Sequence, residues 1–244
     1  MNLLPLDSEW ERLLNVNDCL PAFAEIMNGW YPTDDEIERF VKCWLREGIP
    51  FCFHQHPAAY GRLRDTVAAR LSEEPLNVGI VGSGRIGFSL NPSKQLQRFC
   101  KNRSDLDLFL VSDRWFRDLL DDYEYGVARS EELSYTLDLK TSENIARNRK
   151  TVEGSSWKGT ARRGFIDSNM VPFLPKYWQS KSVLIIDRML DDIKKEVAEP
   201  PFDWRMPDRK RLSLRVYRDW DSFFRQSQLS LQKTVEQLSK GEDN

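Results

Sequence analysis

The fold is decided by two stretches of sequence, VGIVGSGRIG at residues 78–87 and SDLDLFLV at residues 104–111. In each stretch a short apolar run, typical of a buried strand, stands beside small or acidic residues. Gly82, Gly84 and Gly87 match the G-x-G-x-x-G pattern of a dinucleotide-binding turn, and an acidic residue follows about 20 positions further on. The same stretches also fit a phosphate-binding Gly-Ser turn followed by two carboxylates on one strand. Two interpretations of the site therefore compete.

The alternation of acidic and apolar residues at positions 104–111 favours the interpretation as a pair of carboxylates on one strand. Because successive side chains of a strand point to opposite faces, Asp105 and Asp107 project together and the leucines beside them project the other way. Two carboxylates directed at one point suit Mg²⁺ or Mn²⁺, and a pair of such ions can bind the attacking and leaving oxygens of a phosphoryl group. A dinucleotide-binding fold instead places its acid at the carboxyl end of a strand, after a continuous helix. Here Pro92 would end a helix begun at Gly84 after about two turns.

The composition is typical of an intracellular globular enzyme. The 244 residues include 40% hydrophobic and 30% charged residues, with a formal net charge of -2, which suits one domain or one and a half. No apolar stretch approaches about 20 residues and the sequence begins without a signal pattern, so we expect no membrane insertion and a cytoplasmic location. The cysteines form no CxxC pair and are expected to be reduced: Cys19, Cys43, Cys52 and Cys100.

The hydrophobic pattern divides the chain into three parts. We expect an N-terminal helical segment at residues 1–75, packed on a core at residues 76–239 that has a helical C-terminal part, and a flexible tail at residues 240–244. The expected fold class is α+β, with a small mixed β-sheet flanked by many helices. The pattern predicts helices at residues 57–71, 115–123 and 220–238, weaker helices at residues 131–150 and after Val183, and a strand at residues 212–217, with Ser112 or Asp113 as a helix cap.

Gly82-Ser83 at a strand end, followed by Ser104-Asp105-Leu106-Asp107 entering another strand, resembles the polymerase-β-like nucleotidyltransferase superfamily. The resemblance implies that the sheet is a nucleotidyltransferase core, that Gly82 and Ser83 bind a nucleoside triphosphate, and that Asp105 and Asp107 hold the catalytic Mg²⁺ or Mn²⁺. Backbone donors at a helix start suit phosphate, and a small residue lets phosphate approach. Arg85 and Ser104 are the further candidates for nucleotide binding, although Arg85 could equally face water.

The sequence of the wider segments 49–53, 82–90 and 104–112 resembles that of bacterial anti-phage enzymes of the Hailong type. That resemblance implies template-independent synthesis of a nucleotide oligomer, in that group a single-stranded DNA that restrains a membrane effector. The expected substrates are nucleoside triphosphates such as ATP or dATP, and an effector protein encoded alongside is the expected partner. Two alternatives stay open: a toxin-like nucleotidyltransferase that modifies tRNA or a protein, and a non-catalytic nucleotide-sensing subunit.

The third carboxylate of such a site has no obvious place in this sequence. The expected strand at residues 212–217 offers Ser213, Arg215 and Tyr217 on its inward face rather than an acid. Asp219, just past that strand, is the first candidate for a third catalytic acid, and the more distant candidates are Asp138 and Asp167. The separation of Ser83 from Asp105 is also longer than in many members of the superfamily, which predicts an insertion at residues 91–103.

Simpler structural roles compete with these assignments. Asp105 and Asp107 could be solvent-facing residues of an edge strand, and Ser83 could serve only as a helix cap. Arg215 and Arg218 could meet the triphosphate or lie on the surface.

Overall fold

The chain forms an α+β structure, as its sequence predicts. The computed structural model describes residues 33, 35, 37–38, 41–89, 97–100, 104–133, 137–154, 159–172, 180–198 and 212–241. Two compact units are present, each assembled from separate segments. The first unit comprises Met1–Tyr60, Ile80–Leu106 and Phe224–Asn244, and the second unit comprises Gly61–Gly79 and Asp107–Phe223.

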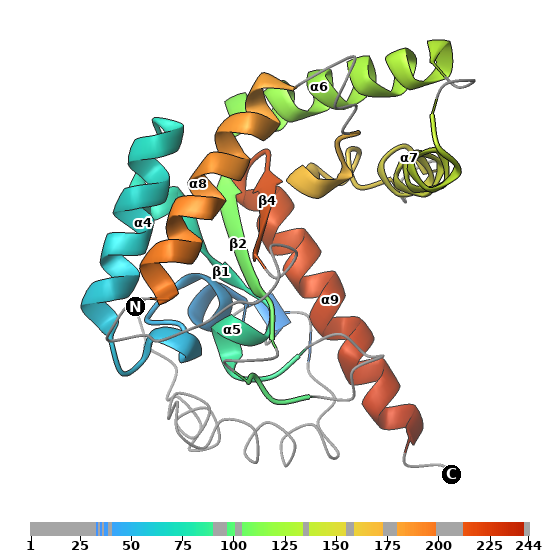
Figure 1. The fold of residues 1–244 in the computed structure, drawn as a ribbon. Helices are drawn as coiled ribbons and strands as arrows, with labels where there is room; N and C mark the ends of the chain where they lie inside the picture. Colours follow the sequence, from blue (N-terminus) through green and yellow to red (C-terminus); the bar gives the residue numbers. More distant parts are fainter. Residues whose placement is uncertain are drawn as a thin grey trace. The chain divides into compact units, whose positions relative to one another are not determined.

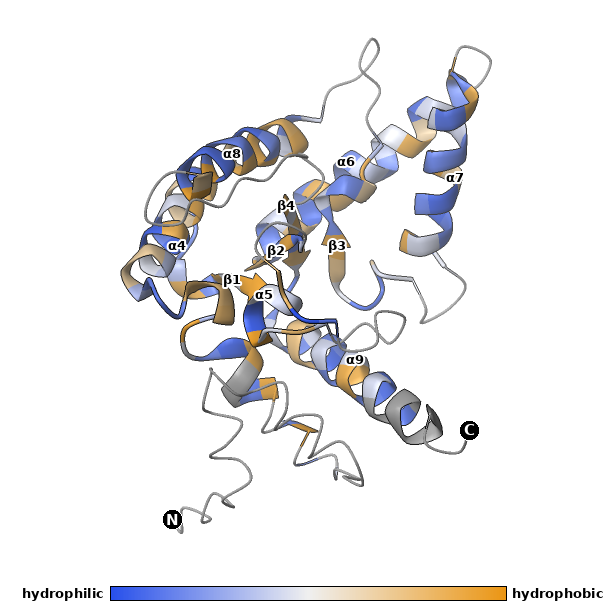
Figure 2. Ribbon diagram, turned by 60° about the horizontal axis from the view of Figure 1, so that its bottom comes forward, coloured by the Kyte–Doolittle hydropathy of each residue, from blue (hydrophilic) through white to orange (hydrophobic). Residues whose placement is uncertain are grey.

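In the described part of the chain, four strands form one sheet in the order β1-β2-β4-β3 (Figure 1; β3 is labelled in Figure 2). The strands are β1 (Val78–Val81), β2 (Leu106–Val111), β3 (Phe165–Asp167) and β4 (Leu212–Tyr217). β3 and β4 are antiparallel, and their register places Asp167 opposite Arg215. The three strands at residues 78–81, 106–111 and 212–217 were predicted from the sequence, whereas β3 was not. A strand of three buried residues is too short to show an alternating pattern.

Four long helices lie wholly or mainly in the described part of the second unit. They are α4 (Pro57–Leu71), α6 (Asp113–Glu132), α7 (Leu139–Val152) and α8 (Lys181–Ala198). The apolar face of α8 is buried at three- and four-residue spacing, and α8 packs against α6 (Figure 1). Hydrophilic and hydrophobic residues both occur along α8, as expected of a helix with one buried side (Figure 2).

An aromatic cluster fills the core where β2 and β4 meet the start of α9 (Trp220–Gly241). The rings of Phe109 and Phe223 lie 4.6 Å apart, and Tyr217 approaches Phe223 edge-on at 5.2 Å. All three side chains are at most 3% exposed. Such aromatic pairs add stabilisation beyond the area that they bury, so this cluster anchors β4 beside β2.

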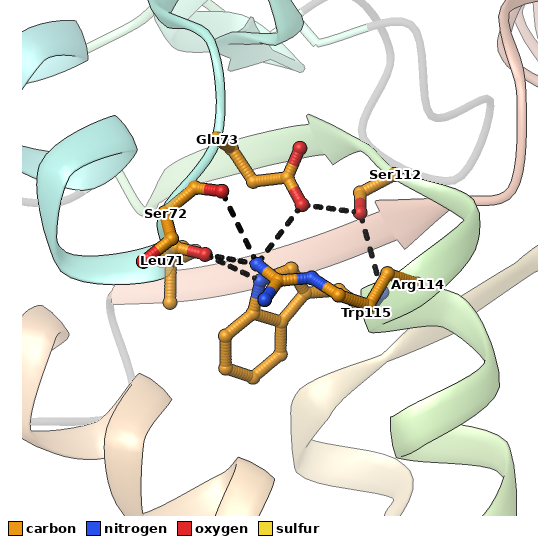
Figure 3. A network of polar contacts seen from close by, with 6 residues as sticks. All are labelled: Leu71, Ser72, Glu73, Ser112, Arg114 and Trp115. Carbon is orange, nitrogen blue, oxygen red and sulfur yellow. Dashed lines mark hydrogen bonds and ion pairs between the residues drawn. The ribbon is translucent and has the colours of Figure 1, made fainter.

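The end of α4 is closed by a left-handed residue. Ser72 has a φ of 53°, and the N–H of Glu73 donates to the carbonyl of Ala68 at 2.9 Å, which is the main hydrogen bond of a Schellman cap. The last carbonyl of the helix, that of Leu71, accepts a hydrogen bond of 2.8 Å from the indole N–H of Trp115 (Figure 3). A side chain of α6 thus satisfies a carbonyl that the helix leaves free.

The start of α6 joins the same network. Ser112 is the N-cap, since its Oγ accepts from the N–H of Trp115 at 3.2 Å, which decides between the two expected caps. The Ser112 hydroxyl also donates to Glu73 at 2.7 Å, and Arg114 pairs with Glu73 at 3.2 Å (Figure 3). The C-terminus of α4 and the N-terminus of α6 are therefore held together by one polar network within the second unit.

In the first unit the chain makes one helical turn and then reverses. α5 (Ser83–Ile86) ends at Gly87, which has a φ of 86°. The sequence limited any helix begun at Gly84 to about two turns before Pro92, and the left-handed Gly87 ends α5 earlier, after one turn. The chain then forms an antiparallel bridge between Phe88 and Arg98. The predicted insertion at residues 91–103 lies mostly outside the described residues.

Candidate functional site

The turn after β1 has a backbone that requires glycine. Gly82 has φ 67° and ψ -153°, a combination that is essentially restricted to glycine. Gly82 is also the N-cap of α5, so Ser83 is the first helical residue and not the cap that the sequence suggested. Ser83 is half-buried. The backbone conformation of this turn therefore requires glycine at position 82, whether or not a ligand binds there.

The other two glycines of the motif are explained by close packing. A Cβ on Gly84 would lie 3.3 Å from a methyl group of Ile80 and 3.5 Å from the sulfur of Cys52. A Cβ on Gly87 would lie 2.9 Å from the ring of Phe51, and the positive φ of Gly87 adds strain. The resemblance to a dinucleotide fingerprint therefore comes from one turn and two tight contacts, and the single turn of α5 lacks the continuous helix of that fold.

Arg85 and Ser104 make local contacts. Arg85 is 5% exposed, and its guanidinium donates to the carbonyl of Gly48 at 2.9 Å. Ser104 closes a turn, since its hydroxyl accepts from the N–H of Cys100 at 2.8 Å and its own N–H donates to the Cys100 carbonyl. Both side chains have structural partners in the first unit, and their expected role in nucleotide binding stays a prediction.

The cysteines of this region are free, as expected. Cys52 and Cys100 form no disulfide, while the side chains of Cys19 and Cys43 lie outside the described ones. Burial raises the pKa of the Cys52 thiol far above its ordinary value. A protonated buried thiol is a poor nucleophile, so Cys52 serves packing against Gly84.

The predicted alternation around the two aspartates is confirmed. Asp105 immediately precedes β2 and Asp107 lies within it, and both are half-buried. Leu106 and Leu108 are 0% exposed. The carboxylates therefore alternate with core residues. Asp107 has a specific partner, because the hydroxyl of Ser213 on β4 donates to its Oδ1 at 2.8 Å.

β4 presents a polar face made of Ser213 and Arg215, whose alternate neighbours are buried leucine and valine. Arg215 donates to both carboxylate oxygens of Asp167, from Nε at 2.7 Å and from an Nη at 3.0 Å. Burial lowers the pKa of the Arg215 guanidinium, but the attraction of Asp167 outweighs burial and the pKa is raised. Asp167, one of the candidates for a third acid, is thus the partner of an arginine.

The first candidate for a third acid caps a helix. Asp219 accepts from the N–H of Ser222 at 2.7 Å and from Nε of Arg218 at 2.8 Å. Partial burial raises the pKa of Asp219, but these hydrogen bonds outweigh it and lower the pKa to about 2. The sequence carried a signal for this role, since an aspartate immediately before an apolar helical period is typical of an N-cap.

Asp138 likewise caps the N-terminus of α7. Its carboxylate accepts from the N–H and the hydroxyl of Thr141, at 2.9 and 2.8 Å. The pKa of Asp138 is lowered, chiefly by the hydrogen bond from the Thr141 N–H. All three candidates for a third acid therefore have defined partners within the second unit, and whether Asp219 also acts in catalysis stays a prediction.

No protein-family model, curated protein or solved structure matches this chain. Within the ranges that the structure describes, no helix is both long and apolar enough to cross a membrane.

The chemistry of the donor set fits a hard divalent cation. Among the described residues, no group of three or more His, Cys, Asp or Glu is arranged to hold a metal. Asp105 and Asp107 supply carboxylate oxygens, and Mg²⁺ is commonly bound by one or two carboxylates together with water and substrate phosphates. The sequence reasoning identified these two acids but missed Ser213 as the partner of Asp107. Pairing between β2 and β4 is long-range, and the sequence alone carried no signal for its register.

Proposed function

We propose that this chain is a metal-dependent nucleotidyltransferase that uses nucleoside triphosphates. Asp105 and Asp107 would hold Mg²⁺ or Mn²⁺, which neutralises charge on the triphosphate and its leaving group. The turn at Gly82 and Ser83 is the candidate for binding phosphate through backbone N–H groups. The observation that carries the proposal is the half-buried Asp107, which alternates with fully buried leucines and is oriented by Ser213.

The proposed reaction is an in-line displacement. A hydroxyl of the acceptor attacks the α-phosphorus of the triphosphate, a new phosphorus–oxygen bond forms, and the bond to the bridging oxygen breaks. Pyrophosphate leaves with the electron pair of that bond, and the hydroxyl proton passes to solvent. The residues of the chain contribute mainly by positioning reactants and by stabilising developing charge.

In keeping with the resemblance of its motifs, we propose template-independent synthesis of a nucleotide oligomer from substrates such as ATP or dATP. A role in bacterial anti-phage defence, with an effector protein encoded alongside, extends the same proposal. A toxin-like enzyme that modifies tRNA or a protein is the enzymatic alternative, and the acceptor distinguishes the two.

A second function is favoured by the composition of β4. The residue that faces Asp107 is Ser213, and the next polar residue, Arg215, pairs with Asp167. Because a third carboxylate usually activates the attacking hydroxyl, its replacement by a serine favours a subunit that binds nucleotide without turning it over. This non-catalytic sensor would bind triphosphate and release no pyrophosphate.

One experiment separates the two functions. The purified full-length chain is incubated with each ribo- and deoxyribonucleoside triphosphate and with Mg²⁺ or Mn²⁺, while pyrophosphate is measured and products are weighed by mass spectrometry. Triphosphate binding is measured in parallel. The nucleotidyltransferase proposal expects pyrophosphate and a product that grows by nucleotide units. Binding without pyrophosphate under every condition would establish the sensor instead.

Matched variants locate the site. Asp107→Asn is expected to abolish pyrophosphate release, because it removes a carboxylate ligand of the metal while retaining the shape of the side chain. Asp118→Asn, on the exposed side of α6, is the control and is expected to retain full activity. Activity that persists in a variant carrying both Asp105→Ala and Asp107→Ala would show that the metal site is elsewhere.

A further inference from the structure

A cavity of about 710 Å³ lies within the second unit, between α7, α8 and the first residues of β4. The other described residues of its lining belong to the short 3-10 turn η6 (Ser168–Met170) and to the two residues after it. This volume is in the range of cavities that hold small organic ligands, roughly 300–1,000 Å³. None of the site residues predicted from the sequence lines it.

The two helices turn mixed faces toward the cavity. From α7 these are Thr141, Asn144, Ile145 and Asn148, which recur at three- and four-residue spacing and so share one side of the helix. α8 contributes apolar and charged residues at similar spacing, including Val183, Leu190 and Lys194. The lining thus combines amide and hydroxyl groups with apolar surface.

The charges of the described lining residues balance. Among these residues, Arg147 and Lys194 are opposed by Asp187 and Asp191, which gives them no net charge. A cavity built for a free triphosphate would carry a clear excess of positive charge. Amides that donate and accept, hydroxyls and apolar side chains instead match a planar, polar, largely uncharged group with hydroxyls, which is the chemistry of a nucleoside.

The cavity is connected to Asp107 through one side chain. Ser213 lines the cavity and donates its hydroxyl hydrogen to Oδ1 of Asp107 at 2.8 Å. A ligand that reaches Ser213 is therefore one hydrogen-bonded side chain away from the proposed metal ligand.

We propose that this cavity binds a nucleoside, and that this nucleoside carries the acceptor hydroxyl of the proposed transfer. The second part rests on the proposed function, whereas the first does not. A nucleoside of this kind is present both in a free nucleotide and at the 3′ end of a short single strand. Among the acceptors that the motif leaves open, the proposal favours a nucleotide or the 3′ end of a short strand.

Direct binding tests the first part. The full-length chain, without triphosphate, is titrated with nucleoside monophosphates and with single-stranded tetranucleotides, and binding is followed by calorimetry. We expect saturable binding of at least one probe, and the two probe classes distinguish the sources. Asn144→Trp fills the cavity from α7 and is expected to weaken binding about tenfold or more. Ala146→Trp adds the same side chain to an exposed position of α7 and is expected to change nothing.

Each outcome decides the inference. The absence of binding by the unmodified chain, or equal binding by Asn144→Trp and the unmodified chain, would overturn it. Circular dichroism and urea unfolding of both variants show whether Asn144→Trp is folded. If it is not, Asn144→Leu, which removes the amide from the lining without filling the cavity, takes its place with the same expectation of weaker binding.

The proposed role of the bound nucleoside as the acceptor is tested by a separate measurement. Pyrophosphate release measured with the best probe as acceptor should fall in parallel with binding in the Asn144 variant, and the probe should be extended by one nucleotide. If nucleoside binding requires Asn144 but no pyrophosphate appears under any condition, the proposed function fails while the nucleoside site stands. A labelled protein in place of an extended probe would overturn the acceptor role.

Discussion

Ser213 on β4 donates a hydrogen bond of 2.8 Å from its hydroxyl to Oδ1 of Asp107 on β2. The two residues are separated by 106 positions in the sequence and meet only because β4 lies beside β2 in the sheet. This bond orients one of the two carboxylates that the sequence singles out. It also places a hydroxyl, rather than a third acid, at the position that faces Asp107.

Removal of the Ser213 hydroxyl should loosen the metal site. We expect Ser213→Ala to weaken Mn²⁺ binding about tenfold, since residues that orient metal ligands commonly have effects of 10–100-fold. The free energy of unfolding should fall by only about 1 kcal/mol, the usual value for one hydrogen bond. Ser213→Thr keeps the hydroxyl and should retain metal binding. Isothermal titration with Mn²⁺ and urea unfolding measure both effects, and equal Mn²⁺ affinities in the two variants would contradict the positioning role.

The pair of Asp167 and Arg215 should contribute more to stability than the surface pairs. Asp167→Asn is expected to lower the free energy of unfolding by about 2 kcal/mol, because it breaks a two-fold charged hydrogen bond and leaves a cation in the protein without its carboxylate. Asp192→Asn is the matched control, since Asp192 pairs with Arg70 on the exposed surface and such pairs contribute about 0–1 kcal/mol. Urea unfolding of both variants at pH 7 tests this ranking, and equal losses would refute it.

The sequence predicted those elements whose pattern is local. β2 and β4 follow from alternation, and α8 follows from apolar residues at helical spacing, because each pattern is complete within one segment. β3 escaped prediction because its three residues are buried together and have no alternation. Pro92 set only an upper limit for a helix begun at Gly84, and Gly87, whose positive φ stops the helix, ends α5 before that limit.

Long-range pairing limited prediction of the site. The spacing of Asp105 and Asp107 was enough to identify them, because both belong to one strand. The partnership of Asp107 with Ser213 depends on the register between two strands, and the partnership of Asp167 with Arg215 depends on an unpredicted strand. No pattern within a single segment encodes either register.

Asp219 should give a measurable acid dependence of stability. At pH 7 we expect Asp219→Ala to lower the free energy of unfolding by about 1 kcal/mol, through loss of a helix cap. The pKa of Asp219 is lowered to about 2 in the folded chain, from an ordinary value of 3.8. Its ionised form is therefore favoured by folding, and this stabilisation is present above pH 4 and disappears as the pH falls through 2. The difference between the unmodified chain and Asp219→Ala should narrow over that interval, as measured by urea unfolding.

Asp219→Asn separates the cap from the predicted catalytic role. Asparagine is about as good an N-cap as aspartate, so this variant should remain close to the unmodified chain in stability at pH 7. If Asp219 is the third catalytic acid, the same variant should lose pyrophosphate release although it is folded. A stable variant that retains pyrophosphate release would remove Asp219 from the catalytic residues and leave it as a cap.

Two glycine substitutions should have opposite effects on stability. Gly82→Ala is expected to lower the free energy of unfolding by about 1–3 kcal/mol, because φ 67° and ψ -153° are essentially closed to residues with a Cβ. Gly61→Ala, within α4, should raise it by about 0.5–1 kcal/mol, since an added Cβ has no atom within 4 Å and alanine favours the helix. Urea unfolding measures both changes. A neutral Gly82→Ala would mean that the turn does not require its left-handed backbone, and glycine at this position would then need a ligand to explain it.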